Sequence, residues 1–168
     1  MLVRLAKAGD LLALMALVRR VVPLMQADGN LQWDDEYPNP QVFGRDIDAA
    51  ELWVAEPERG VLAGVAAITT DQSPEYADVG WDIHEPAIVV HRLAVDPAYR
   101  GAGIATALML HAEKVARERG ISVLRVDTNT QNPATRQLLP KLGYTLAGEI
   151  GLAFRPGLRF FCYEKRLP

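Results

Sequence analysis

The chain has 168 residues, of which 49% are hydrophobic and 23% are charged, with a net charge of −3 and a pI near 5.6. This size and composition are typical of one folded domain with a substantial core. The weak negative charge excludes a global field able to hold a nucleic-acid backbone. The local basic residues Lys114, Arg117 and Arg119 have Glu113 and Glu118 as neighbours, which is typical of a solvated helix face.

The single cysteine, Cys162, excludes an internal disulfide and any metal site built from cysteines. It lies in the apolar run 160–163, so we expect a buried strand thiol rather than a nucleophile. Free thiols are typical of proteins in the reducing cytoplasm, and we expect the protein to be located there. The apolar stretch 11–18 is too short to cross a bilayer and lacks the flanks of a signal peptide, so we expect no membrane association.

The first half of the chain mixes short strands with helices. Apolar residues recur at helical spacing between an N-cap at Asp10 and a stop at 28–30, and Pro23 should kink or divide this helix. A loop rich in acids and aromatics follows, and then a short helix that ends near Ala50. The strands expected in this half lie at residues 2–5, 52–55 and 61–69.

The second half is more regular after an irregular stretch at 71–86. A helix begins after Gly101 and Gly103, runs to Arg119 and is capped by Gly120. The other expected elements are strands at 88–95, 121–127, 144–150 and 159–166, and a helix at 132–142 that Pro140 shortens or distorts. This order predicts a mixed sheet covered by helices, and no repeat or linker divides residues 1–168, so we expect a single domain.

A glycine-rich turn at 96–106 joins the strand at 88–95 to the next helix. Such a turn leaves several backbone N–H groups unpaired at the positive end of a helix dipole. Glycine suits it because a Cβ would collide with a phosphate close to the backbone, and Arg100 could add a charged hydrogen bond. The turn therefore predicts a pyrophosphate site.

Two other phosphate-binding motifs do not fit this turn. A Walker A loop needs a lysine that residues 104–106 do not have, and a dinucleotide fingerprint would need Gly or Ala where Thr106 stands. The dinucleotide turn also normally follows the first strand, whereas this turn comes after four strands. From the glycines alone, a merely tight strand-to-helix turn stays open.

The residues around the glycines carry a resemblance. The pattern Arg100-x-x-Gly103-x-Ala105 resembles the acetyl-CoA signature (Gln/Arg)-x-x-Gly-x-(Gly/Ala) of the GNAT acetyltransferases. Asn132, followed by Leu138 and the run 141–144, resembles the second cofactor segment of that family. The resemblance extends over nearly the whole chain and implies an α/β (α+β) fold, with a mostly antiparallel sheet of six or seven strands, about four helices and a V-shaped splay between strands four and five.

A narrower likeness points to a bacterial GNAT subgroup without assigned substrates. Its residues are 28–33, Tyr37-Pro38, Tyr76, Trp81, 91–95, Asp127-Thr128 and 163–165.

The resemblance implies acetyl-CoA as the cofactor. Main-chain groups of Leu93 and Val95 would pair with pantetheine, a backbone N–H near Leu93 would polarise the thioester carbonyl, and Asn132 would bond to the cofactor chain. The expected cofactor-binding residues are Leu93, Ala94, Val95, Arg100, Gly101, Ala102, Gly103, Ile104, Ala105, Thr106 and Asn132.

Acetyl transfer to an amine needs a base, because an aliphatic amine has a pKa near ~10.4. His91 is the candidate, since strand alternation would place residues 89, 91, 93 and 95 on one face and an imidazole pKa of ~6.5 suits the task. Several GNAT members resemble this chain in placing Glu or His on that strand. The alternative is a histidine hydrogen-bonded within the sheet.

One position departs from the family pattern. Many GNAT enzymes place a tyrosine seven residues after the asparagine as general acid, and here that position holds Leu139. General-acid help is worth roughly 10²–10⁴-fold, so its loss slows the reaction without forbidding it. Tyr144 is expected to pack in the core, whereas Tyr163 on the last strand is a candidate for contact with the acceptor.

The acceptor side of the fold is expected to involve the aromatics Trp33, Tyr37 and Trp81, which stand among carboxylates and would suit a cationic amine. They could equally anchor their loops to the core. We therefore predict an acyltransferase that acetylates a primary amine of a small molecule or peptide, with no nucleic-acid partner. The alternatives are a non-catalytic acyl-CoA-binding protein and a protein-lysine acetyltransferase. The apolar strand 160–163 could support a homodimer or complete the sheet's own core.

Overall fold

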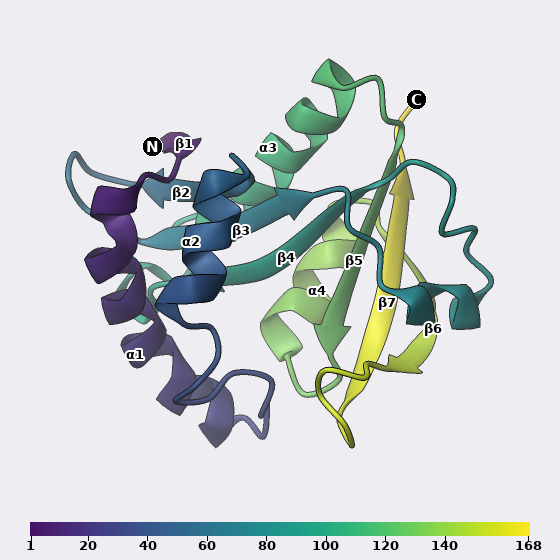
Figure 1. The fold of residues 1–168 in the computed structure, drawn as a ribbon, viewed down its shortest axis with the longest axis horizontal. Coiled ribbons are helices and arrows are strands. Elements are labelled where there is room, and N and C mark those ends of the chain that lie inside the picture. The colour runs from purple at the N-terminus through teal and green to yellow at the C-terminus, as the bar shows by residue number, and fades with distance from the viewer.

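A seven-stranded mixed sheet in the order β1-β2-β3-β4-β5-β7-β6 forms the centre of the structure, a computed structural model that describes residues 1–168 (Figure 1). The strands are β1 (Leu2–Leu5), β2 (Leu52–Glu56), β3 (Gly64–Thr69), β4 (Ile88–Val95), β5 (Val123–Asn129), β6 (Thr145–Gly151) and β7 (Arg159–Arg166). The helices are α1 (Leu11–Ala27), α2 (Pro40–Asp48), α3 (Ile104–Glu118) and α4 (Pro133–Lys141), with short 3₁₀ turns η1 (Ala8–Asp10), η2 (Pro74–Val79) and η3 (Pro97–Tyr99).

The sheet splays open between β4 and β5, the one parallel pair. These strands are in register only at Ile88–Leu124 and Val89–Arg125, and beyond Val89 they diverge (Figure 1). All other neighbours are antiparallel. The GNAT-like fold predicted from the sequence, with its V-shaped opening, is therefore confirmed.

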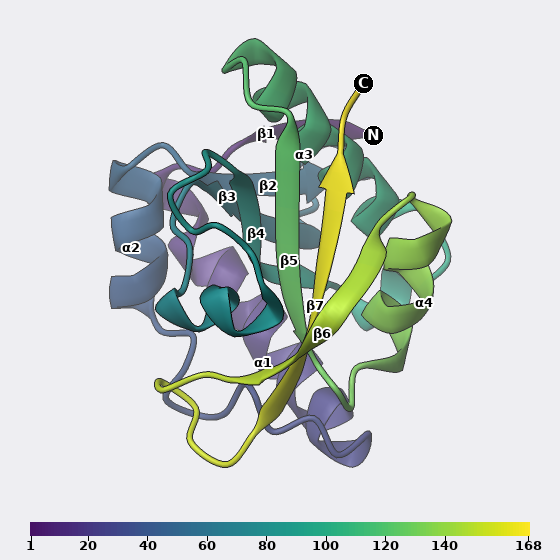
Figure 2. The same ribbon diagram turned by 90° about the vertical axis from the view of Figure 1, so that its right-hand side faces the viewer.

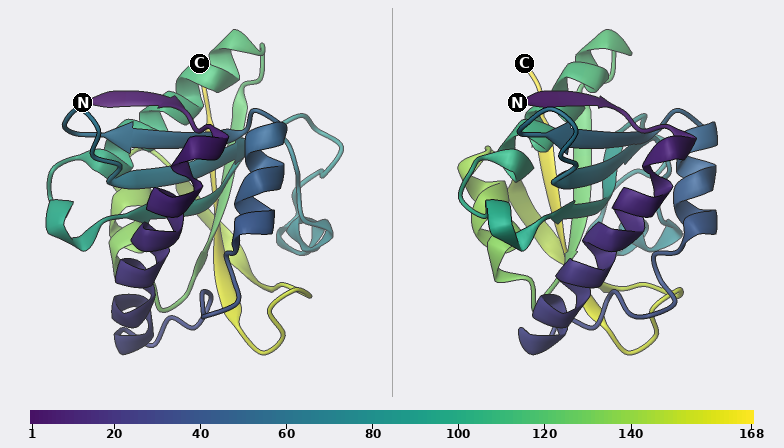
Figure 3. Two further views of the ribbon diagram at one scale, coloured as in Figure 1. Left: turned by 60° about the vertical axis from the view of Figure 1, so that its left-hand side comes forward. Right: turned by 90° about the vertical axis from the view of Figure 1, so that its left-hand side faces the viewer.

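Helices cover both faces of the sheet. α1 and α2 lie on one face and α3 on the other, as Figure 3 shows. Around β5, β7 and β6, α4 packs on one side and the segment that holds η2 packs on the other (Figure 2). Cys162 is fully buried in β7, where burial raises the pKa of its thiol to about 12, so the expected buried strand thiol is confirmed.

Pro23 was expected to kink or divide helix α1. The helix continues through Pro23, so the division does not occur. Proline removes one N–H donor from the helix and costs roughly 3 kcal/mol at an interior position. Val18, Val21 and Val22 are buried directly before it, and this packing holds the helix against the sheet. No helix of the structure is long and apolar enough to cross a bilayer.

A bulge interrupts β4 at the centre of the sheet. Val65 pairs with Ala94 and Ala67 pairs with His91, so one residue of β3 faces two of β4. Arg92, one of those two, has a φ of 52°, which lies in the left-handed region. A bulge shifts the side-chain alternation of its strand by one position.

The shift overturns one sequence prediction. Before the bulge Val90 packs toward α3, whereas beyond it Leu93 and Val95 pack toward α3 and Ala94 packs toward α1. His91 therefore points to the face opposite Leu93, and the expectation that residues 89, 91, 93 and 95 share one face is wrong. Simple alternation fails here because the extra residue cannot be recognised from its neighbours in the sequence.

Candidate functional site

Two cavities meet where β4 and β5 diverge. The cofactor cleft, as we name the larger one, has a volume of about 560 Å³ and is lined by the end of β4, the turn before α3 and the start of α4. The acceptor cavity has a volume of about 340 Å³ and is lined by the centres of β4 and β5 and by three loops. Both are lined by Met25, Leu93, Asn132 and Thr135, so a molecule in one can reach a molecule in the other.

The turn before α3 presents a row of free donors to the cofactor cleft. Gly101 and Gly103 have φ values of 78° and 80°, a conformation in which glycine avoids the steric penalty of other residues. Gly103 caps the helix without a side-chain hydrogen bond. The backbone N–H groups without an acceptor in the protein are those of Gly101, Gly103, Ile104, Ala105 and Thr106. Together with the helix dipole, these donors fit a diphosphate.

The open edge of β4 offers further main-chain groups. Asp96 donates its N–H to the carbonyl of Ala63 on the β3 side. Because alternate residues of a strand direct their main-chain groups to the same side, Leu93 and Val95 direct theirs away from β3, toward the splay. This edge can pair with an extended chain of amides. Asp96 also binds Arg20 of α1 at 2.7 Å, which ties the end of β4 to that helix.

Asn132 stands at the junction of the two cavities. Its side-chain oxygen accepts the N–H of Thr135 at 3.2 Å and so caps α4. The side-chain NH₂ then remains available to a ligand. Leu138 lines the cofactor cleft, whereas Leu139 is fully buried on the core side of the same helix.

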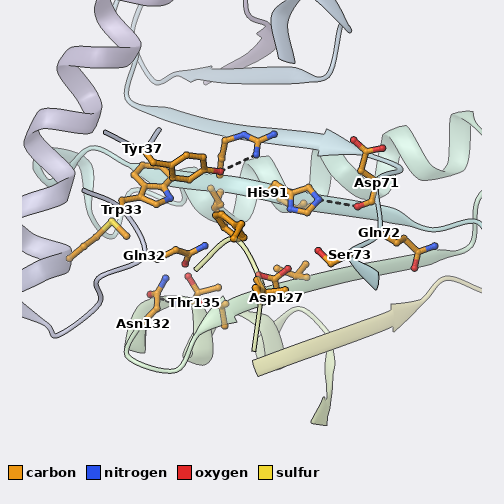
Figure 4. A pocket seen from close by; sticks show the side chains of 18 residues that line it. Gln32, Trp33, Tyr37, Asp71, Gln72, Ser73, His91, Asp127, Asn132 and Thr135 are labelled. Carbon is orange, nitrogen blue, oxygen red and sulfur yellow. Dashed lines mark hydrogen bonds between the residues drawn. The ribbon is translucent and has the colours of Figure 1, made fainter. Parts of the chain in front are cut away.

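His91 and Asp127 project into the acceptor cavity from β4 and β5 (Figure 4). His91 Nε2 lies 3.1 Å from the carbonyl oxygen of Asp71. A carbonyl only accepts, so this bond assigns the proton to Nε2 and leaves Nδ1 with its lone pair.

Asp127 accepts a hydrogen bond from the hydroxyl of Tyr76, which is fully buried. Burial raises the pKa of the Asp127 carboxyl, while the nearby His91 acts in the opposite direction. The same burial, with Asp127 as neighbour, raises the pKa of the Tyr76 hydroxyl.

Aromatic side chains close the other end of the acceptor cavity. Trp33 is 3% exposed, and Tyr37 meets Phe154 edge to face with ring centroids 5.6 Å apart. The guanidinium of Arg92 donates to the Tyr37 hydroxyl at 3.2 Å and to both oxygens of Asp46 at 2.7 and 2.8 Å. The bulge thus places Arg92 where it holds Tyr37 against the cavity.

One wall of the acceptor cavity is formed by the loop at 70–87. The guanidinium of Arg125, which is 1% exposed, donates to Gln72 at 2.5 Å and to the carbonyl of Asp82 at 2.9 Å. It also pairs with Glu85 and Glu164. Because Asp71 and Gln72 line the cavity, Arg125 determines the position of this wall.

Most of the predicted site residues are brought together. The predicted cofactor residues all line one or both cavities except Ala102. His91, Trp33 and Tyr37 line the acceptor cavity.

Three aromatic residues lie outside both cavities. Trp81 packs edge-on against Tyr76, with ring centroids 5.1 Å apart, and lies under Arg125. Tyr163 is 5% exposed and packs in the core around α3. Tyr144 is buried, as expected, and its hydroxyl has no partner.

Sequence reasoning missed Asp127 as a site residue. An aspartate inside a strand that is rich in valine and leucine is a signal that could have found it, because Asp is depleted in strands. Asp71 and Gln72 carried no such signal, since they lie in a polar loop.

Comparisons with known proteins agree with this geometry. The model of the acetyltransferase (GNAT) family matches residues 18–144. Human N-acetyltransferase 8 is 30% identical over 116 residues, covering 69% of this chain and 44% of that protein. The streptothricin acetyltransferase of Streptomyces lavendulae is 30% identical over 105 residues, covering 62% of this chain and 49% of that protein. The chain therefore spans less than half the length of these curated relatives.

Solved structures share the fold. A GNAT-family acetyltransferase from Streptococcus agalactiae superposes with a TM-score of 0.83 at 26% identity, over 99% of this chain and 95% of that one. A Salmonella typhimurium protein, solved with its cofactor acetyl-CoA, superposes with a TM-score of 0.73 at 22% identity, over 99% and 94% of the two chains. With a family match over residues 18–144, a splayed sheet and a turn whose free N–H donors fit a diphosphate, this chain belongs to the acetyltransferase (GNAT) family.

Proposed function

We propose that the protein transfers an acetyl group from acetyl-CoA to a primary amine of a small molecule or peptide, directly and within a ternary complex. The observation that carries this proposal is the meeting of the two cavities at Leu93 and Asn132. One cavity presents free N–H donors and the other presents His91. Streptothricin acetyltransferase and N-acetyltransferase 8, the relatives described above, are acetyltransferases by name.

Acetyl-CoA supplies the activated acyl group, and the residues present fit it. The N–H groups of the turn from Gly101 to Thr106 would hold the pyrophosphate, with Arg100 beside them. Leu93 and Val95 would pair with the pantetheine amides at the open edge of β4. The Leu93 N–H would also donate to the thioester carbonyl oxygen as negative charge develops there.

His91 would act as the base. At pH 7 only about one in 10³ molecules of an amine with a pKa near 10.4 is neutral, so the acceptor arrives as an ammonium ion. Nδ1 of His91 carries the lone pair because Nε2 is bonded to Asp71, and it would take the proton as the amine attacks. General-base help of this kind is worth roughly 10²–10⁴-fold in rate.

The departing thiolate would receive no help from the position of the usual tyrosine. Leu139 is fully buried and points away from both cavities. A thiol of pKa near ~8.5 leaves without a general acid, at a lower rate. The same observation is what favours the second candidate function, a non-catalytic acyl-CoA-binding protein.

Thiol release from acetyl-CoA in the presence of polyamines, aminoglycosides, amino acids and short peptides tests the proposal. We expect turnover with one class of small amine. We expect His91→Ala to lower kcat by about 10²–10⁴-fold while leaving the affinity for acetyl-CoA unchanged. His84→Ala is the matched control, because His84 is exposed on the neighbouring loop and lines neither cavity.

The other outcomes separate the alternatives. Tight binding of acetyl-CoA without turnover on any acceptor would replace the proposal with the acyl-CoA-binding protein. Turnover only with folded protein acceptors would favour a protein-lysine acetyltransferase. Full activity of the His91→Ala variant would remove His91 from the mechanism without removing the activity.

A further inference from the structure

The acceptor cavity contains a carboxylate with spare capacity to bind a cation. One oxygen of Asp127 accepts the Tyr76 hydroxyl, and the other accepts no hydrogen bond from a neighbouring residue. Burial opposes ionisation of this group and raises its pKa. A carboxylate in such surroundings gains most from a ligand that is a cation and a hydrogen-bond donor at once.

The cavity offers no free cation for an anionic ligand. Arg92 is the one guanidinium in its lining. Asp46 binds its Nε and Nη2 at 2.7 and 2.8 Å, and its Nη1 donates to the Tyr37 hydroxyl at 3.2 Å. Arg155 lies nearby but does not line the cavity. Its Nη1 pairs with Asp34 at 3.2 Å, its other two nitrogens are buried, and its guanidinium stacks on the rings of Tyr37 and Phe154. A carboxylate on the acceptor would therefore meet Asp127 without a compensating partner.

The remaining lining is suited to an apolar or aromatic body. Trp33 and Tyr37 stand at the end of the cavity away from Asp127 (Figure 4). Phe154 packs against Tyr37, and Leu152 adds an apolar contact. Aromatic walls opposite a carboxylate match a molecule with an ammonium group at one end and a ring or alkyl chain at the other.

We propose that Asp127 binds the ammonium group of the acceptor, and that the cavity selects a primary amine on an aromatic or alkyl body without a neighbouring carboxylate. The proposal rests on the proposed function, because it identifies the class of its acceptor. Asp127 and His91 project into the same cavity from adjacent strands, so an ammonium ion bound to Asp127 lies within the reach of the proposed base.

Isothermal titration of the intact protein saturated with CoA tests this without any turnover. The ligands are two matched pairs that differ by one carboxylate, tyramine with tyrosine and pentylamine with norleucine. We expect at least one amine to bind at least about 10-fold more tightly than its amino acid, as the loss of a charged hydrogen bond implies. The comparison uses the wild-type protein and so does not depend on the folding of a variant.

Variants then assign the effect to one side chain. Asp127→Asn should weaken binding of that amine about 10- to 100-fold while the affinity for CoA stays unchanged. Asp78→Asn is the matched control, because Asp78 is an exposed carboxylate on η2 that lines neither cavity, and its effect should stay within about twofold. Tyr76→Phe keeps the carboxylate and should retain amine binding.

Several results would overturn the proposal. They are failure of both amines to bind, equal affinity of each amine and its amino acid, and unchanged amine binding by a folded Asp127→Asn variant. Failure of the proposed function would give a different result from failure of this inference. In that case tyramine or pentylamine binds through Asp127 but no acetyl transfer follows. Turnover on acceptors that bind independently of Asp127 would leave the function standing and remove this inference.

Discussion

At the residue scale, the backbone conformation of Arg92 determines which side chains of β4 reach the site. A non-glycine residue in the left-handed region costs about 1–2 kcal/mol. Here the hydrogen-bonded ion pair with Asp46 offsets that cost. In return the bulge places Leu93 at the junction of the two cavities and His91 in the acceptor cavity alone. The two halves of the site thus receive their residues from one short stretch of β4.

Leu139 carries a prediction at the same scale. Because this side chain is fully buried in the core around α3, a tyrosine placed there cannot reach the cofactor cleft. We expect Leu139→Tyr to leave kcat without improvement and to lower the free energy of unfolding by about 1–3 kcal/mol, through overpacking and an unpaired hydroxyl.

Steady-state kinetics and denaturant unfolding of the Leu139→Tyr variant measure both effects. Leu138→Tyr is the informative companion, since Leu138 lines the cleft and is only partly buried. A higher kcat of the Leu139→Tyr variant would contradict this prediction, because it would show that the side chain at position 139 can reach the cofactor cleft.

At the scale of elements, the loop at 70–87 depends on one buried side chain. Arg125 binds Gln72, Glu85 and the carbonyl of Asp82, so a residue of β5 holds a long irregular segment against the sheet. The loop has only one 3₁₀ turn of its own, η2, and these bonds replace regular structure as the source of its position.

Arg125→Lys should loosen this wall of the acceptor cavity. A lysine has a single nitrogen and cannot reproduce the fork of hydrogen bonds. We expect the KM for the amine to rise several-fold, the affinity for acetyl-CoA to stay unchanged, and the free energy of unfolding to fall by about 1–3 kcal/mol. Steady-state kinetics in which the amine and acetyl-CoA are varied separately will show whether only the KM for the amine changes.

The matched control for Arg125 is Arg166→Lys. Arg166 pairs with the same two carboxylates, Glu85 and Glu164, but is 56% exposed. Exposed pairs contribute about 0–1 kcal/mol, so this variant should behave almost as the wild type. Equal effects at both arginines would argue against a special role for Arg125 in shaping the cavity.

At the scale of the whole molecule, the two halves of the sheet meet through only two residue pairs at the start of β4 and β5. Beyond them the cofactor cleft is lined by residues of both halves, from β4 on one side and from the start of α4 on the other. A ligand bound in this cleft should therefore tie the halves together as well as occupy its own contacts.

We expect CoA to raise the melting temperature. At a concentration 100 times its Kd, a ligand that binds only the folded state stabilises it by about 2.7 kcal/mol. For a domain of this size that corresponds to a rise of about 5–10 °C. Differential scanning calorimetry with and without CoA measures the shift.

Two glycine variants make the thermal measurement specific. Gly103→Ala and Gly157→Ala both place a Cβ at a positive φ of 80° and 84°, so both should lower the basal melting temperature. Only Gly103 lies in the cofactor cleft, so only its variant should reduce the shift caused by CoA. An equal reduction at Gly157 would contradict the assignment of the turn.

Local pattern by itself predicted most of the strands and helices and the glycine-rich turn before α3. The strand at 159–166 was predicted with its observed bounds, and the helix after Gly103 with an error of one residue at its end. These features depend on residues close in the chain: apolar spacing, glycines at positive φ, and free N–H groups at a helix start. The splay between strands four and five was predicted only from the resemblance to the GNAT family.

Only the tertiary structure decided the acceptor side. The sheet at Arg92 admits an extra residue because Asp46 lies within reach of its guanidinium, and Asp46 is distant in the sequence. Tyr76 and Asp127 are also distant in the sequence and meet only in the folded chain. The same is true of Arg125 and the loop at 70–87. Such contacts follow from how packed elements place distant side chains, which no local pattern encodes. The residues of the cofactor cleft could thus be predicted from the sequence, as could His91, Trp33 and Tyr37, whereas the contacts that shape the acceptor cavity could not.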